Sequence, residues 1–266
     1  MGHAANAGAS GRADGLPELE ERLRYELEVL GLPAKAWSVP HFHEGRPVAD
    51  VAIVGGGMTG LCMAASLWMA GLTRVDIYDA APAGKEGPWL TSARMETLRT
   101  SKDALGPALG IPSLTFRAWY EAVNGPSSWG PLDKASRSSW AAYLAWYRDV
   151  LKIDIRNGKR VTTIRPAGTE RVDLEVSDDA GLLEKVAARR VVLASGFDGF
   201  GVPSVPPIFE GLDRKFWAHS SEAIDFGALR GVRVGIVGIG ASAVDNASTA
   251  LEHGARFVDF FIRRAA

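Results

Sequence analysis

A run of glycines near residue 55 has the composition and spacing needed to bind phosphate groups. Gly55, Gly57 and Gly60 follow the pattern G-x-G-x-x-G. The first glycine of this pattern makes a tight turn, the second lets a phosphate approach the backbone, and the third lets a helix pack closely on a strand. A helix that begins here directs free N–H groups and a partial positive charge at the phosphates. The other residues of the turn are Gly56, Met58 and Thr59.

An acidic residue further along the chain completes this first fingerprint. Asp79 lies 24 residues after Gly55, at the end of the next expected strand. Its carboxylate would accept hydrogen bonds from a ribose and would repel a 2′-phosphate. The site therefore favours FAD or NAD over NADP.

A second fingerprint lies near the end of the chain and has different chemistry. The segment Gly238-Ile239-Gly240-Ala241-Ser242-Ala243 follows the pattern G-x-G-x-x-A. Ile262 occupies the position equivalent to Asp79, and Arg263 and Arg264 come next. Guanidinium groups bind phosphate in a bidentate fork, so this pair favours the 2′-phosphate of NADPH. The alternative is that both arginines are solvated residues at a strand end.

Apolar runs on either side of each glycine turn predict the elements that position it. In the first unit we expect a strand over Val51–Val54, a helix over Thr59–Ala70 and a strand over Val75–Tyr78. The same order of elements is expected from Val232 to Ile262. Strands joined by a helix indicate an α/β fold with a parallel sheet.

The remaining segments predict a smaller set of elements. Residues 171–176 alternate apolar and charged side chains, which predicts a half-exposed strand. Residues 33–47 are expected to form a linker, and residues 80–135 to be rich in loops. The other expected elements are helices over Leu16–Leu30 and Trp140–Leu151, and strands over Val161–Ile164, Leu183–Ala187 and Val191–Ala194.

Composition narrows the classes of function. The 266 residues carry a net charge of -1, which disfavours nucleic acid and anionic membranes as partners. Cys62 is the single cysteine, which excludes a disulfide framework and favours the reducing cytoplasm. The first fifteen residues lack the apolar core of a signal peptide, and we expect them to form a disordered tail. We expect no metal site, and the residues do not indicate the oligomeric state.

Two dinucleotide units in one chain resemble the flavoproteins with two dinucleotide-binding domains, and most of all the class B flavin monooxygenases. That class includes the flavin-containing, Baeyer–Villiger and N-hydroxylating monooxygenases. The resemblance covers residues 48–266. Four further segments carry it: Glu86-Gly87-Pro88-Trp89 resembles a Gly-Gly-x-Trp segment, Thr97–Lys102 a threonine- and lysine-bearing segment, Ala194-Ser195-Gly196 an Ala-Thr-Gly turn, and Trp217–Ser221 the end of an F-x-G-x-x-x-H pattern.

Three features depart from this resemblance. Where the flavin-containing monooxygenases place an asparagine near the flavin, this chain has Arg99. Asp213 and Lys215 stand where the F-x-G-x-x-x-H pattern has Phe and Gly, so only its histidine end matches. The sequence also ends at Ala266, one βαβ unit into the second nucleotide domain. We therefore expect a chain truncated at its C-terminus.

The resemblance implies a Rossmann-type, three-layer FAD-binding domain with a small β-meander, followed by the start of a Rossmann-type NADPH-binding domain. The expected boundaries are 1–47 for the tail, short helix and linker, 48–200 for the FAD-binding domain, 201–230 for a connection and 231–266 for the incomplete NADPH unit.

The resemblance also implies the cofactors and the reaction. NADPH would reduce FAD, and a flavin C4a-peroxide would oxygenate a small ketone, amine or sulfide with oxygen as co-substrate. Two alternatives stay open: a flavin reductase that passes electrons to a partner, and an inactive fragment that binds FAD and NADP.

The implied site residues fall into two groups. Arg99, Lys102 and His219 are the catalytic candidates, although the two cations could instead be surface charges paired with Glu86 and Glu96. The implied FAD contacts, besides the glycines and Asp79, are Met58, Thr59, Trp89, Arg94, Ala194 and Gly196.

Overall fold

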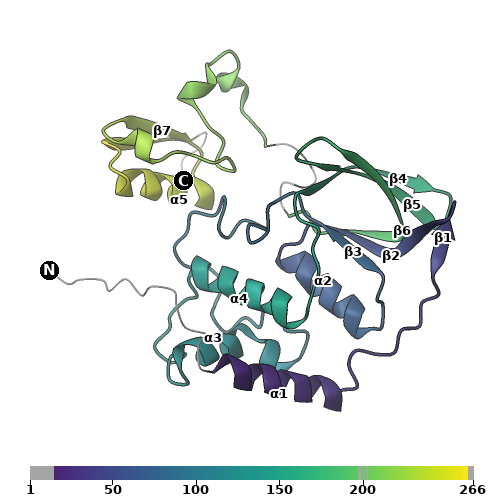
Figure 1. Ribbon diagram of the computed structural model, residues 1–266. Coiled ribbons are helices and arrows are strands. Elements are labelled where there is room, and N and C mark those ends of the chain that lie inside the picture. The colour runs from purple at the N-terminus through teal and green to yellow at the C-terminus, as the bar shows by residue number, and fades with distance from the viewer. Residues whose placement is uncertain (1–14, 197–198, 200, 202, 263–266) are drawn as a thin grey trace.

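The computed structural model describes residues 15–196, 199, 201 and 203–262. Figure 1 shows a large sheet with helices below it, and a smaller unit formed by the last part of the chain. The chain therefore has the α/β organisation that its sequence predicts.

Three parallel strands form the centre of the large sheet. Strand β2 (Arg46–Val54) lies between β3 (Val75–Tyr78) and β6 (Leu183–Leu193). Ile53 pairs with Ile77 on one side and with Val192 on the other. Side chains on both faces of β2 are buried, as is usual for parallel strands covered on both sides.

Helices cover one face of this sheet (Figure 1). Helix α2 (Met58–Met69) links β2 to β3, and α4 (Arg137–Val150) lies beside it. Helices α1 (Leu16–Val29) and α3 (Phe116–Asn124) lie further from the sheet. Aromatic side chains fill the space between α3 and α4, where the rings of Phe116 and Trp140 are 5.2 Å apart.

A β-meander covers the opposite face of the sheet. Strands β4 (Lys159–Ala167) and β5 (Arg171–Asp178) run antiparallel to each other and continue from β6. Leu174 and Val176 of β5 are buried against Ala52 of β2, whereas Asp173 is exposed. The alternation predicted for this strand is confirmed, and helices, sheet and meander make three layers.

The smaller unit repeats the strand–helix–strand order of the first. Strand β7 (Arg233–Val237), helix α5 (Ala241–Glu252) and strand β8 (Phe257–Phe261) follow one another, and the two strands pair in parallel. Three short 3₁₀ turns precede this unit, at Pro207–Phe209, Arg214–Phe216 and Gly227–Leu229.

Two expectations about local structure were wrong. The two strands expected over Leu183–Ala187 and Val191–Ala194 are one strand, β6, which ends at Leu193 and changes its partner from β5 to β2 at Ala188. The polar Arg189 and Arg190 at that point interrupt the apolar run, which made one strand look like two.

The second error concerns an element too short to give a clear period. The expected linker includes β1 (His41–His43), which pairs with the start of β2. Residues 80–135 are rich in loops, as expected, and also include a 3₁₀ turn at Pro112–Leu114 and helix α3, whose start is capped by Thr115.

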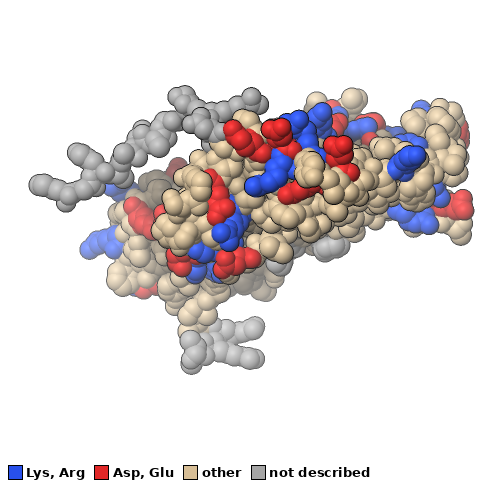
Figure 2. All heavy atoms as spheres, turned by 90° about the horizontal axis from the view of Figure 1, so that it is seen from below, with Lys and Arg blue, Asp and Glu red and all other residues tan. Residues whose placement is uncertain are grey.

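The surface agrees with the near-neutral charge. In Figure 2, basic and acidic side chains lie interspersed over the visible face. Within the described parts of the chain, every helix is too short or too polar to cross a membrane.

Candidate nucleotide-binding sites

The first glycine turn packs closely against the backbone that follows β6. Gly55 has a φ of 105°, a conformation that side chains strongly disfavour. A Cβ atom at Gly55 would lie 2.4 Å from the carbonyl oxygen of Ala194. Glycine is therefore required here both by the backbone conformation and by the close approach of Ala194, and Gly196 follows in the next turn with a φ of 75°.

The start of α2 has one glycine that leaves no room for a side chain and one where a methyl group would fit without a clash. A Cβ atom at Gly60 would lie 1.9 Å from the carbonyl oxygen of Gly55, so the helix packs directly on the turn. At Gly57 the nearest described atom to such a Cβ is the Cα of Gly87, at 3.6 Å. No described side chain caps this helix, so the N–H groups of its first turn, from Met58 and Thr59 onwards, are free for a ligand.

Asp79 lies at the same turn, at the end of β3. Its Oδ2 accepts a hydrogen bond of 2.6 Å from the N–H of Gly56, and its Oδ1 accepts one of 2.7 Å from the N–H of Ala81. Each carboxylate oxygen can accept a further hydrogen bond. The bare backbone at Gly57, the free N–H groups and this fixed carboxylate together fit a dinucleotide.

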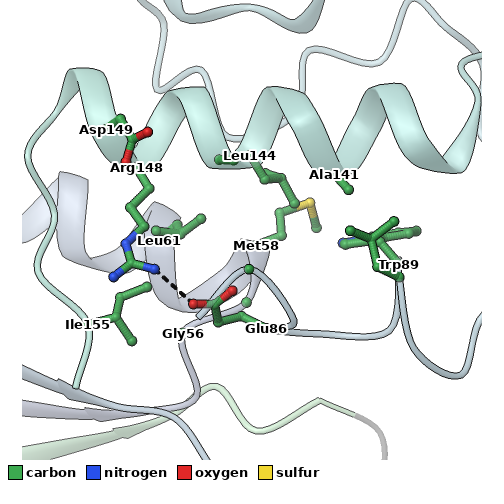
Figure 3. A pocket seen from close by; sticks show the side chains of 14 residues that line it. Gly56, Met58, Leu61, Glu86, Trp89, Ala141, Leu144, Arg148, Asp149 and Ile155 are labelled. Carbon is green, nitrogen blue, oxygen red and sulfur yellow. Dashed lines mark hydrogen bonds and ion pairs between the residues drawn. The ribbon is translucent and has the colours of Figure 1, made fainter. Parts of the chain in front are cut away.

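A cavity of about 230 Å³ adjoins the turn (Figure 3). Its walls include Gly56 and Met58 at the start of α2, Trp89 in the loop after β3, and Leu144 of α4. The indole Nε1 of Trp89 is buried and has no hydrogen-bond partner among the described residues. Buried donors are usually paired, so this free indole N–H is suited to a ligand atom.

One ion pair stands out among these largely apolar walls. The Nη1 atom of Arg148 lies 2.8 Å from Oε1 of Glu86 (Figure 3), and the side-chain nitrogen of Asn157 donates to the same oxygen at 2.7 Å. Arg148 and Asn157 were not predicted from the sequence, and Glu86 was predicted only as part of the Gly-Gly-x-Trp-like segment and as an alternative pairing partner for the cations. Glu86 replaces a glycine of the Gly-Gly-x-Trp pattern, which was the available signal.

Arg94 connects the first unit to the segment before β7. Its guanidinium donates to the carbonyl oxygens of Thr91, at 2.6 Å, and Glu222, at 3.0 Å. It also lies 5.5 Å from the ring centre of Phe226. Burial, and then the positive charge of Arg137, lower the pKa of Arg94. A direct contact of Arg94 with FAD stays a prediction.

The three catalytic candidates each have partners of their own. Arg99 Nη2 lies 2.7 Å from both carboxylate oxygens of Asp245 in α5. The ammonium group of Lys102 donates to the carbonyl oxygens of Trp129, Gly130 and Leu132 at 2.8, 3.3 and 2.5 Å. His219 Nδ1 lies 2.8 Å from Oγ of Ser221. The predicted pairing of Arg99 and Lys102 with Glu86 and Glu96 is not among these contacts, and the catalytic roles stay predictions.

The second fingerprint has the same backbone geometry in more open surroundings. Gly238 has a φ of 115°, and its N–H donates to the carbonyl oxygen of Phe261 at 2.9 Å. A Cβ atom at Gly238 or Gly240 would meet no described atom within 4 Å. Residues Ala241, Ser242 and Ala243 form the first turn of α5, again without a side-chain cap from the described residues.

The features expected to select the nucleotide lie at the end of β8. Ile262 follows this strand, so no carboxylate occupies the position that Asp79 has in the first unit. Arg263 and Arg264, to which the sequence analysis assigned the 2′-phosphate, lie outside the described residues.

Comparison with known proteins identifies the family. The model of an FAD-NAD(P)-binding family matches residues 52–198, and that of the L-lysine 6-monooxygenase/L-ornithine 5-monooxygenase family matches residues 132–265. Each match covers half of the chain or more. The chain therefore belongs to the FAD-NAD(P)-binding flavoproteins and to the lysine/ornithine monooxygenase family, which confirms the resemblance to class B flavin monooxygenases.

A curated relative supports the same assignment. A FAD-dependent urate hydroxylase of Xanthomonas campestris pv. campestris is 42% identical over 253 residues, which are 94% of this chain and 53% of that protein. The chain thus spans about half the length of this curated relative.

Two solved structures share the fold. An ornithine hydroxylase of Pseudomonas aeruginosa matches with a TM-score of 0.67 and 19% identity, over 82% of this chain and 55% of that one. A cadaverine monooxygenase of the desferrioxamine pathway of Erwinia amylovora, bound to FAD, matches with a TM-score of 0.65 and 18% identity, over 82% and 52%.

Proposed function

We propose that this chain supplies the FAD site and part of the NADPH site of a flavin-dependent monooxygenase that acts on a small organic substrate. The observation that carries this proposal is the geometry of the first fingerprint. Gly57, which carries no side chain and lines the cavity, adjoins the free N–H groups of α2 and the fixed carboxylate of Asp79. These three features fit the pyrophosphate and ribose of FAD.

The roles of the chain's own residues follow from this placement. The first turn of α2 would bind the pyrophosphate, Asp79 would accept hydrogen bonds from the ribose, and Trp89 would donate its free N–H in the adjoining cavity. When bound, the flavin supplies the redox chemistry, namely acceptance of hydride from NADPH and activation of oxygen.

The second fingerprint would bind NADPH. The absence of an acid at Ile262 removes the repulsion that would oppose a 2′-phosphate, and Arg263 with Arg264 would bind that group. Replacing both arginines by alanine should raise the KM for NADPH at least tenfold and leave the KM for NADH nearly unchanged, since an interaction of about 1.4 kcal/mol changes binding tenfold. An equal loss for both nucleotides would contradict this role.

The substrate class is proposed from the relatives. One is a urate hydroxylase and others act on ornithine or cadaverine by their names, so nitrogen-containing small molecules are the first substrates to test. The test measures oxygen and NADPH consumption by the FAD-loaded chain with urate or ornithine, together with the hydroxylated product. Consumption coupled to product supports a monooxygenase. NADPH oxidation that requires an added electron acceptor and yields no product would instead favour a reductase.

A further inference from the structure

Glu86 introduces a negative charge beside the proposed phosphate site. It lines the same cavity as Gly56 and Gly57, and only 11% of its side chain is exposed. The next residue, Gly87, lies against Gly57, where the phosphate would approach the backbone. An uncompensated carboxylate at this place would repel a pyrophosphate, and burial would strengthen the repulsion.

Arg148 compensates this charge from the last turn of α4. Its Nη1 lies 2.8 Å from Oε1 of Glu86, and 23% of its side chain is exposed. Figure 3 shows the two side chains meeting at the wall of the cavity. A partly buried charge pair of this kind is screened less by salt than a surface pair.

Asn157 joins this pair to the turn that holds Asp79. Its side-chain nitrogen donates to Glu86 Oε1 at 2.7 Å and to the carbonyl oxygen of Ala81 at 3.1 Å. The N–H of Ala81 in turn donates to Asp79. The loop that carries Glu86 is thus fixed to α4 on one side and to the expected ribose site on the other.

We propose that Arg148 is a positioning residue for FAD: its guanidinium cancels the charge of Glu86, so that an anionic pyrophosphate can bind beside Gly57, while Asn157 keeps the loop of residue 86 in place. This inference rests on the proposed binding of FAD to the first fingerprint. It assigns a function to a helix residue that the glycine motif does not include.

Charge compensation and simple structural support predict different results in a double-mutant cycle. The dissociation constant for FAD is measured by equilibrium dialysis for the wild-type chain, Arg148→Met, Glu86→Gln and the double variant. Arg148→Met should weaken FAD binding about tenfold or more, equivalent to about 1.4 kcal/mol. The double variant should return to within about threefold of the wild type, because the unpaired carboxylate is gone.

Glu86→Gln by itself gives a second test that does not require the loss of Arg148. Glutamine keeps an oxygen that accepts from Arg148 and Asn157, and it leaves the guanidinium charge uncompensated. FAD should therefore bind as tightly as in the wild type or more tightly. Tenfold weaker binding by Glu86→Gln, or a double variant as weak as Arg148→Met, would overturn the proposal.

A matched control separates this effect from a general loss of charge. Arg117 and Glu121 form an exposed ion pair on α3, with 3.0 Å between the paired atoms. Arg117→Met should leave the affinity for FAD unchanged. If the wild-type chain itself bound no FAD, the proposed function would fail and this inference with it. If the wild-type chain bound FAD but the variants did not show the predicted pattern of dissociation constants, only the inference would be overturned.

Discussion

The two glycine turns of this chain have the same spacing but different surroundings. In the first unit, Gly55 faces the carbonyl oxygen of Ala194 at a distance that leaves no room for a side chain. In the second, the equivalent Gly238 has open space around it among the described residues. Both have a positive φ, of 105° and 115°.

This difference shows that glycine is required at the two equivalent positions for different physical reasons. In the first unit, tertiary packing requires it, because β6 runs beside β2 and places Ala194 against the turn. In the second unit, the backbone conformation alone requires it within the described structure. The third position of the motif shows the same contrast, since Gly60 packs on Gly55 while Ala243 carries a side chain at the equivalent place.

The largest effect is expected from alanine at the first glycine of each turn. Gly55→Ala combines backbone strain with a backbone clash and should lower the free energy of unfolding by about 4 kcal/mol. Gly238→Ala meets only the strain and should cost about 1–2 kcal/mol. Urea denaturation of both variants measures their free energies of unfolding. Equal losses of stability would contradict the difference in packing between the two turns.

The second glycine of each turn should affect binding rather than stability. Gly57→Ala meets no contact closer than 3.6 Å, and Gly240→Ala meets none within 4 Å of the described atoms. Each variant should unfold within about 0.5 kcal/mol of the wild type. Gly57→Ala should weaken FAD binding at least tenfold, since the added methyl group occupies the path of the phosphate. Gly240→Ala, as the matched control, should retain FAD affinity and weaken NADPH.

A smaller effect on stability is expected from a substitution seven residues after the first glycine of a turn. This position is Cys62 in α2 and Asp245 in α5, and Asp245 pairs with Arg99 across the two units. Half of the Arg99 side chain is exposed, at 51%, so Asp245→Asn should cost no more than about 0.5–1 kcal/mol of stability.

The same variant should slow the reduction of bound flavin by NADPH, because the pair joins the two nucleotide units. Stopped-flow absorbance without oxygen measures this rate. The matched control is Asp173→Asn, which breaks an ion pair with Arg171 inside the meander and should leave the rate unchanged. An unchanged rate in Asp245→Asn would show that the Arg99–Asp245 pair is not needed to hold the two nucleotide units together for hydride transfer.

The smallest effect concerns the reactivity of Cys62. Burial raises the pKa of this thiol. Because the thiolate is the reactive form, a raised pKa means less thiolate at pH 8 and slower alkylation. Iodoacetamide should therefore react more slowly with the folded chain than with the chain in urea. Equal rates would show that α2 is less tightly packed than described.

The sequence predicted those parts of the site that depend on local patterns. Glycine spacing, an apolar strand on each side and an acid at Asp79 are all features within one βαβ unit, and the structure places them together. The pairs Arg99–Asp245 and Glu86–Arg148 join residues 146 and 62 positions apart. Each pair joins a loop residue to a helix residue and depends on how the two pack after folding, so no spacing in the sequence reveals it.

The most direct test of the central claim is a visible absorption spectrum of the purified chain reconstituted with FAD, followed by addition of NADPH without oxygen. The account predicts protein-bound flavin bands that bleach with NADPH, since the first unit would hold the flavin and the second would deliver the reductant. A chain that binds no FAD under these conditions would contradict the assignment of the first fingerprint. Bound flavin that NADPH does not reduce would contradict the assignment of the second.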